Sequence, residues 1–147
     1  MIDEPARSMA TQPNLAAFTT MLPSGRPMTH VMWVDCDGEH LLINTETHRA
    51  KYRNVLANPR VTVTIWDRND PYRYAEVRGR VVETVSGPEA RRHIDELSMR
   101  YVDHPYPADK IGERVILKIG ADRQREKILG GEPPPPGHHR ESDPEVG

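Results

Sequence analysis

The 147-residue chain has the length of a single domain, and its formal net charge of -2 offers no broad basic surface to a nucleic acid. Its lone cysteine excludes an intramolecular disulfide, and no run approaches the roughly 18 apolar residues that a membrane-spanning helix needs. The first residues also lack the apolar segment of a secretory signal. We therefore expect a cytoplasmic protein that binds neither nucleic acid nor membrane.

Short strands separated by turn signals make up most of the chain. Alternating apolar and β-branched residues predict strands over residues 15–22, 28–35, 40–45, 61–66, 74–85 and 114–119. Gly79, inside the fifth of these strands, indicates a bend or a close approach of two backbones. Because the connections between strands are too short for parallel crossovers, we predict a mainly β fold, a six-stranded barrel with helical inserts.

Two helices interrupt the strands. The first is predicted over residues 47–57 and ends before Pro59. The second, over residues 88–102, starts with a capping-box pattern and a proline in its first turn. One face of this second helix carries residues at helical spacing that we expect to pack on the core or on a second subunit: Ala90, Ile94, Leu97 and Tyr101.

Residues 132–147 differ in composition from the rest of the chain. They include four consecutive prolines and almost no apolar side chain. Such a segment cannot bury enough surface to offset the entropy of ordering it. We therefore predict one folded domain over residues 1–131, followed by a disordered tail.

The start of the first predicted helix carries an excess of positive charge. Between residues 47 and 66 the chain has no Asp or Glu and four basic residues, Arg49, Lys51, Arg53 and Arg60. A helix N-terminus is itself partly positive, so cations there are unfavourable unless an anion neutralises them. The pattern predicts a phosphate site, and a solvated basic helix face is the alternative that the charges alone leave open.

Other motifs of catalytic chemistry are missing. The sequence has no P-loop, no dinucleotide-binding glycine motif and no nucleophile elbow. Its histidines lack the spacing of metal ligands, so we expect no metal site, and no side chain stands out as a catalytic group. Aromatic residues gather near predicted strand ends, where they serve either packing or a planar ring: Trp33, Trp66, Tyr72 and Tyr74.

Several segments together resemble a known family. They are Gly25-Arg26-Pro27 with residues 31–34, the Asn-Thr…Arg-Ala-Lys-Tyr-Arg-Asn-Val stretch of residues 44–55, and residues 58–61, 69–74, 77–80 and 94–101. This pattern is similar to that of the pyridoxamine-phosphate-oxidase-like split-barrel superfamily over residues 12–119. It is most similar to the B group of flavin/deazaflavin oxidoreductases, which use coenzyme F420. The resemblance implies a six-stranded split barrel and a homodimer with two cofactor sites at its interface.

The resemblance also implies which residues hold the cofactor phosphate. Thr45, Arg49 and Lys51 match the phosphate positions of the family, in agreement with the charge argument above. Arg53 and Asn54 match motif positions whose role is less defined. These five residues surround the start of the first helix.

A second set of family positions concerns the cofactor ring. Val31, Met32 and Trp33 match the strand that lies beside the ring system. Tyr72 and Tyr74 match a segment that approaches the site from the second subunit. The resemblance thus implies a site that is completed by the partner chain.

The chain departs from the vitamin B6 oxidases of the superfamily. Ala50 stands beside Lys51 where those enzymes carry arginine, and residues 121–126 lack their substrate-binding set. We therefore expect a reductase that transfers a hydride from reduced F420 to an electron-poor double bond of a small organic substrate. The alternatives are an FMN-dependent oxidase or reductase of the same fold, and a protein that binds a flavin, deazaflavin or tetrapyrrole without turnover.

Overall fold

A computed structural model describes residues 1–108 and 112–128 of the chain. Its helices are α1 (Ala6–Ala10), α2 (Ala50–Ala57) and α3 (Pro88–Val102). Its strands are β1 (Leu15–Met21), β2 (Pro27–Trp33), β3 (Asp35–Cys36), β4 (Leu41–Glu46), β5 (Arg60–Asp67), β6 (Asp70–Ser86) and β7 (Arg114–Ile128). The predicted tail, residues 132–147, lies outside the described residues.

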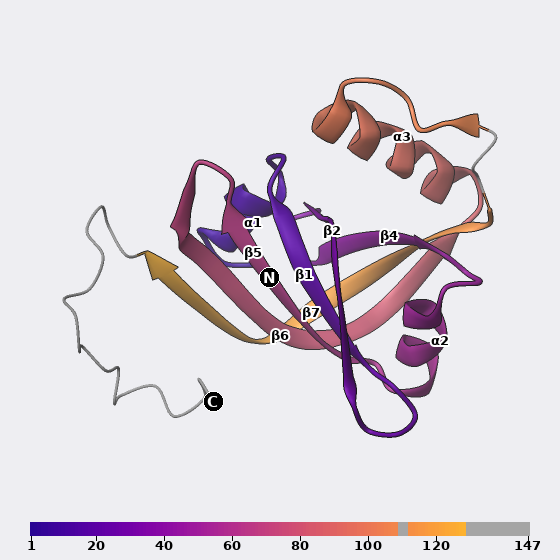
Figure 1. The fold of residues 1–147 in the computed structure, drawn as a ribbon, viewed down its shortest axis with the longest axis horizontal. Helices are drawn as coiled ribbons and strands as arrows, with labels where there is room; N and C mark the ends of the chain where they lie inside the picture. The colour runs from indigo at the N-terminus through magenta and orange to yellow at the C-terminus, as the bar shows by residue number, and fades with distance from the viewer. Residues whose placement is uncertain (109–111, 129–147) are drawn as a thin grey trace.

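The strands form one antiparallel sheet in the order β2-β1-β5-β6-β7-β4-β3. The sheet curls strongly, so that β2 at one end approaches β4 near the other (Figure 1). Within the described residues, no strand pairing joins β2 to β3 or β4. The barrel is therefore split along a line between β2 and β4.

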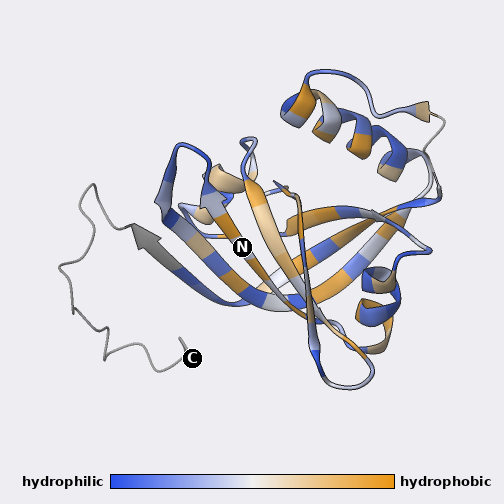
Figure 2. Ribbon diagram, viewed as in Figure 1, coloured by the Kyte–Doolittle hydropathy of each residue, from blue (hydrophilic) through white to orange (hydrophobic). Residues whose placement is uncertain are grey.

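The core fills the inside of this curled sheet. Hydrophobic and hydrophilic residues alternate along the strands, as Figure 2 shows. The inward positions include Phe18, Ile43, Val63 and Leu117, all essentially inaccessible to solvent. The short helix α1 adds buried side chains, Met9 among them, to the same cluster. Burial of this apolar surface is the main force that holds the sheet in its curled form.

The mainly β split-barrel class predicted from the sequence is confirmed, and so is the helix over residues 88–102. The predicted apolar face of that helix is buried at Ala90, Ile94 and Leu97. The expected close backbone approach at Gly79 is also confirmed, because an added Cβ there would overlap with the carbonyl oxygen of Gly120. No helix among the described residues has the length and apolar character to cross a bilayer.

Other details differ from the prediction. The capping box is wrong, because Gly87 with φ of 77° is the N-cap residue of α3 and no side chain caps the helix. The sheet has a seventh strand, the two-residue β3, and β7 continues to Ile128 instead of ending at residue 119. The first predicted helix begins later, at Ala50. The two differences in the strands depend on strand pairing, which local sequence patterns do not encode, and the other two concern helix ends, which are the least predictable part of an element.

Candidate functional site

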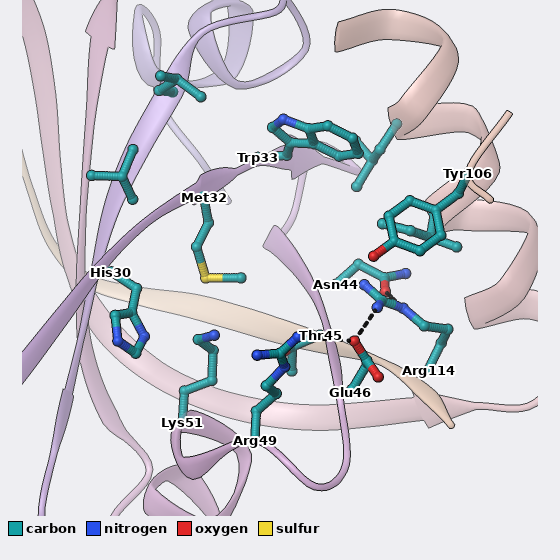
Figure 3. Close-up of a pocket in the computed structure, with 14 residues that line it drawn as sticks. His30, Met32, Trp33, Asn44, Thr45, Glu46, Arg49, Lys51, Tyr106 and Arg114 are labelled. Carbon is teal, nitrogen blue, oxygen red and sulfur yellow. Dashed lines mark hydrogen bonds and ion pairs between the residues drawn. The ribbon is translucent and has the colours of Figure 1, made fainter. Parts of the chain in front are cut away.

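A pocket of about 520 Å³ opens where the barrel is split. Residues 30–33 of β2 form one side and residues 44–46 of β4 the other, while α3 and the start of α2 contribute the remaining walls (Figure 3). Its volume falls in the range of pockets that hold small molecules and cofactors. The two edges of the sheet meet here without pairing, so the fold itself creates the pocket.

One end of the pocket is apolar and has a rigid aromatic wall. Met32, Trp33, Ile94 and Leu97 line it, together with Val31. The indole of Trp33 is fixed by two other rings: it stacks on Tyr101 and meets the edge of Tyr106, with centroids 5.1 Å and 6.5 Å away. This end suits a flat, largely apolar ligand that is recognised by shape and stacking.

The other end of the pocket is positively charged. Arg49, Lys51 and Arg114 line it, and Glu46 is the one carboxylate that the described residues contribute. Oε1 of Glu46 lies 3.3 Å from Nη2 of Arg49 and 3.2 Å from Nη1 of Arg114. Glu46 and Arg114 are buried, whereas half of the Arg49 side chain is exposed. Three cations around one carboxylate leave an excess positive charge for a ligand.

Among the described lysine and arginine side chains that line the pocket, Lys51 is the one without an ion pair. Within residues 1–108 and 112–128 its ammonium group has no hydrogen bond or ion pair, and it points into the pocket (Figure 3). Partial burial lowers the pKa of Lys51, and repulsion from Arg49 and Arg114 lowers it further against the attraction of Glu46. A bound anion would remove this penalty, so Lys51 is poised to accept one.

The backbone at the start of α2 adds to the same field. Arg49 is the N-cap residue, with extended backbone angles and no side-chain cap, and the first turn holds no acidic residue. The first N–H groups of a helix have no partners within it and carry partial positive charge. Lys51 is the second residue of α2 and therefore belongs to this first turn. Helix and side chains therefore attract an anion to the same place.

Six of the ten residues predicted as a cofactor site line the pocket together. They are Val31, Met32, Trp33, Thr45, Arg49 and Lys51. They come from β2, from β4 and from the start of α2, so the fold brings together three segments within residues 31–51 of the chain. Binding of a cofactor by these six residues remains a prediction.

The remaining four predicted residues lie outside the pocket lining. Arg53 donates a hydrogen bond to the carbonyl oxygen of His48 at 2.7 Å, which fixes the turn before α2. Asn54 is buried and donates to Oγ1 of Thr20 at 3.0 Å, so it fastens α2 to β1. Tyr72 and Tyr74 lie on β6, where Tyr72 is half exposed. Within one chain Arg53 and Asn54 support the structure around the site, and Tyr72 and Tyr74 are not part of the pocket lining.

Sequence reasoning missed the buried charges of the pocket. Glu46 and Arg114 face each other as cross-strand partners at the ends of β4 and β7. Asn44, on β4, accepts a hydrogen bond from Nε of Arg114 at 2.9 Å. The signal in the sequence was an acidic residue next to Thr45 and an arginine that starts the last strand. It becomes meaningful only once the β4–β7 register is known.

Solved structures of other proteins share this architecture. A structure described as an F420 reductase is 37% identical, with 84% of this chain and 98% of that chain covered and a TM-score of 0.74. A conserved hypothetical protein from Mycobacterium tuberculosis is 23% identical, with coverages of 86% and 84% and a TM-score of 0.69. A putative pyridoxamine 5'-phosphate oxidase from Listeria innocua is 19% identical, with coverages of 81% and 92% and a TM-score of 0.60. The last two similarities show the fold alone.

The sequence itself matches one family across nearly the whole described region. A search of curated protein sequences found no match. The profile of the pyridoxamine 5'-phosphate oxidase family, in contrast, matches residues 2–127, which include every strand of the sheet except the last residue of β7. The chain therefore belongs to the pyridoxamine 5'-phosphate oxidase family.

Proposed function

We propose that this protein is an F420-dependent reductase that transfers a hydride from reduced F420 to an electron-poor double bond of a small organic substrate. The observation that carries the proposal is the unneutralised ammonium group of Lys51, beside a pocket with a rigid aromatic wall. The 37% identity to a structure described as an F420 reductase supports the choice of cofactor.

The charged end of the pocket fits the phosphate of such a cofactor. Arg49 and Lys51 project from the first turn of α2, and Thr45 adds a hydroxyl group from β4. Charge-assisted hydrogen bonds to phosphate are among the stronger polar contacts in proteins. In this arrangement Lys51 supplies the unpaired charge, while Glu46 keeps Arg49 in place.

The apolar end fits the planar ring. β2 is an edge strand, so the backbone groups on its outer side are free to bond the polar edge of a heterocycle. Trp33, held between Tyr101 and Tyr106, forms a flat wall beside that strand. The ring would lie along β2 with its phosphate chain directed toward α2.

The chemistry of the step belongs to the cofactor, and the protein positions and shields the reactants. Reduced F420, held by Arg49, Lys51 and Thr45, would supply a hydride for one carbon of the substrate double bond, and the proton for the other carbon would come from solvent. The residues at the apolar end hold the substrate against the ring face and exclude bulk water. No described side chain is required as a proton donor in this scheme.

The proposal includes a homodimer. Val31, on the edge strand beside the pocket, is 60% exposed, and Tyr72 on β6 is 51% exposed. Exposed apolar side chains next to an open pocket are typical of a surface that a second subunit covers. A partner chain would cover the open side of each pocket, and Tyr72 and Tyr74 would approach it from across the interface.

Two other functions are compatible with the same pocket. An FMN-dependent oxidase or reductase would use the same kind of ring and phosphate contacts. The two cofactors differ beyond the phosphate, where F420 carries an anionic glutamate tail and FMN does not. A protein that binds a flavin, deazaflavin or tetrapyrrole without turnover would need the contacts to this ligand but no place for a second substrate. The identity to the F420 reductase favours F420 over FMN and turnover over storage.

Cofactor titration followed by a turnover assay tests the proposal. The purified protein is titrated with F420 and with FMN, and the affinities are compared at fixed salt. Oxidation of reduced F420 is then followed by absorbance in the presence of enones, quinones and furanones. Tighter binding of F420 and turnover of at least one substrate are expected. Tighter binding of FMN would favour the flavin enzyme, and binding without turnover would favour the storage protein.

A further inference from the structure

A chain of buried and partly buried polar groups connects α3 with the charged end of the pocket, and the proposed function does not use it. Nη1 of Arg100 lies 2.9 Å from Oδ1 of Asp35, and Oδ2 of Asp35 lies 2.9 Å from Nε2 of His93. Nδ1 of His93 lies 3.1 Å from Nδ2 of Asn44, whose Oδ1 lies 2.9 Å from Nε of Arg114. Four elements, α3, β3, β4 and β7, each contribute a member.

The side-chain amide of Asn44 can adopt only one orientation. The carbonyl oxygen of Ala90, 2.9 Å from Nδ2, can only accept a hydrogen bond, and Nε–H of Arg114 can only donate one. If the amide were turned over, its oxygen would face the carbonyl of Ala90 and its NH₂ group would face the guanidinium group. Asn44 therefore presents NH₂ to Ala90 and its oxygen to Arg114.

This orientation fixes the position of the proton on His93. The NH₂ group of Asn44 also points at Nδ1 of His93, so Nδ1 must accept. The ring proton then lies on Nε2 and is donated to Asp35. Burial alone would raise the pKa of Asp35, but hydrogen bonds from His93, the Cys36 N–H and Arg100 hold that pKa below its ordinary value. Asp35 is thus an ionised acceptor.

The far end of the chain sets the geometry of the pocket. Arg114 receives its orientation from Asn44, and its Nη1 lies 3.2 Å from the Glu46 oxygen that also binds Arg49. His93, Asn44 and Arg114 are each more than nine-tenths buried, so water cannot replace a lost partner without cost. A change at His93 should therefore propagate to Arg114, Glu46 and Arg49.

We propose that His93, as its Nε2–H tautomer, is a positioning residue for the anion-binding end of the pocket and acts through Asn44 on Arg114. It would touch neither cofactor nor substrate. The proposal rests on the proposed function only in taking the pocket ligand to be an anionic cofactor.

The tautomer can be tested without any ligand. Nitrogen-15 NMR of the intact protein at neutral pH should show one histidine with a protonated Nε2 and an unprotonated Nδ1 whose signals disappear in His93→Leu. The Nε–H signal of Arg114 should shift or broaden in His93→Leu and keep its position in Ser98→Ala. Ser98 is a matched control because it is buried on α3 and its hydroxyl group donates to the carbonyl oxygen of His104, which is not a member of this chain of polar groups. A protonated Nδ1 on His93 would overturn the proposal.

Binding gives the second readout. His93→Leu should weaken F420 binding by about 2- to 30-fold, with kcat at saturating cofactor unchanged, as expected of a network coupling. His93→Gln should recover part of this loss, because its carboxamide keeps one acceptor and one donor in place of the ring nitrogens. Ser98→Ala should bind F420 as the parent does even if it lowers stability.

The two readouts separate this inference from the proposed function. If the parent protein does not bind F420, the proposed function fails, and the NMR experiment alone decides the role of His93. If the parent binds F420 and His93→Leu binds it equally tightly, the positioning role is wrong while the proposed function stands. If His93→Leu does not fold, two measurements still test the positioning role of His93: the F420 affinity of His93→Gln and the His93 tautomer in the parent protein.

Discussion

The indole ring of Trp33 lies on the phenol ring of Tyr101, with centroids 5.1 Å apart and planes inclined by 11°. The hydroxyl group of Tyr101 donates to the carbonyl oxygen of Asn14 and accepts from the N–H of Val34, which is 3.0 Å away. Tyr101 therefore connects α3 with two backbone segments: Asn14, just before β1, and Val34, just after β2. The aromatic wall of the pocket is thereby connected to α3 through Tyr101, and Tyr106 adds the edge contact.

Tyr101→Phe tests how much the hydroxyl group contributes. The ring stack would remain, but the N–H of Val34 and the carbonyl of Asn14 would lose a buried partner, so we expect a loss of about 1–3 kcal/mol in the free energy of unfolding. Urea denaturation measures it. Tyr72→Phe, which changes a half-exposed tyrosine on β6, should cost less than about 0.5 kcal/mol. Equal effects of the two changes would show that the Tyr101 contacts do not stabilise the fold.

Asp35 should make part of the stability dependent on pH. Because the pKa of Asp35 is lower in the folded protein than its ordinary value of 3.8, its ionised form stabilises the fold. This contribution is present above the ordinary value and is lost as the pH falls through the folded pKa. Asp35→Asn should therefore destabilise the protein most at neutral pH, and the difference from the parent should narrow in acid. A difference that stays constant over this range in urea denaturation would contradict the assignment.

The exposed apolar side chains near the pocket predict a homodimer. Val31 beside the pocket and Tyr72 on β6 are both more than half exposed in one chain, and a symmetric dimer would cover them. Light scattering should give twice the mass of one chain at micromolar concentration. A stable monomer under these conditions would contradict the proposed homodimer, and no second subunit would then cover the open side of the pocket.

Arg49 and Lys51 should not act independently. Both are predicted to hold one phosphate group, and Arg49 is further anchored by Glu46 at 3.3 Å. Arg49→Ala and Lys51→Met should each weaken F420 binding, and the double variant should lose less than the sum of the two free energies. Strict additivity in a double-mutant cycle would indicate that the two cations bind separate groups.

The sequence predicts most of the strands, because Val61, Val63 and Ile65 alternate with threonines and face the core as expected. It also predicts the cationic turn of Arg49 and Lys51, where charge and helix position conflict in a way that is visible locally. The sequence does not predict the pairing of Glu46 with Arg114 or the contact of His93 with Asp35. These contacts join residues far apart in the chain, so they depend on strand register and on the way α3 lies over the sheet.

Titration calorimetry of F420 binding to Lys51→Met tests the central claim most directly, with Lys118→Met as the matched control. Lys118, on β7, lies outside the pocket and pairs with Glu83. Lys51→Met should weaken binding by roughly 10- to 150-fold, as expected for the loss of one ionic contact to phosphate, and Lys118→Met should bind as the parent does. Without cofactor, Lys51→Met should melt no lower than the parent, because burial and the neighbouring arginines disfavour the charge of Lys51. Equal affinity of Lys51→Met and the parent for F420 would contradict the account.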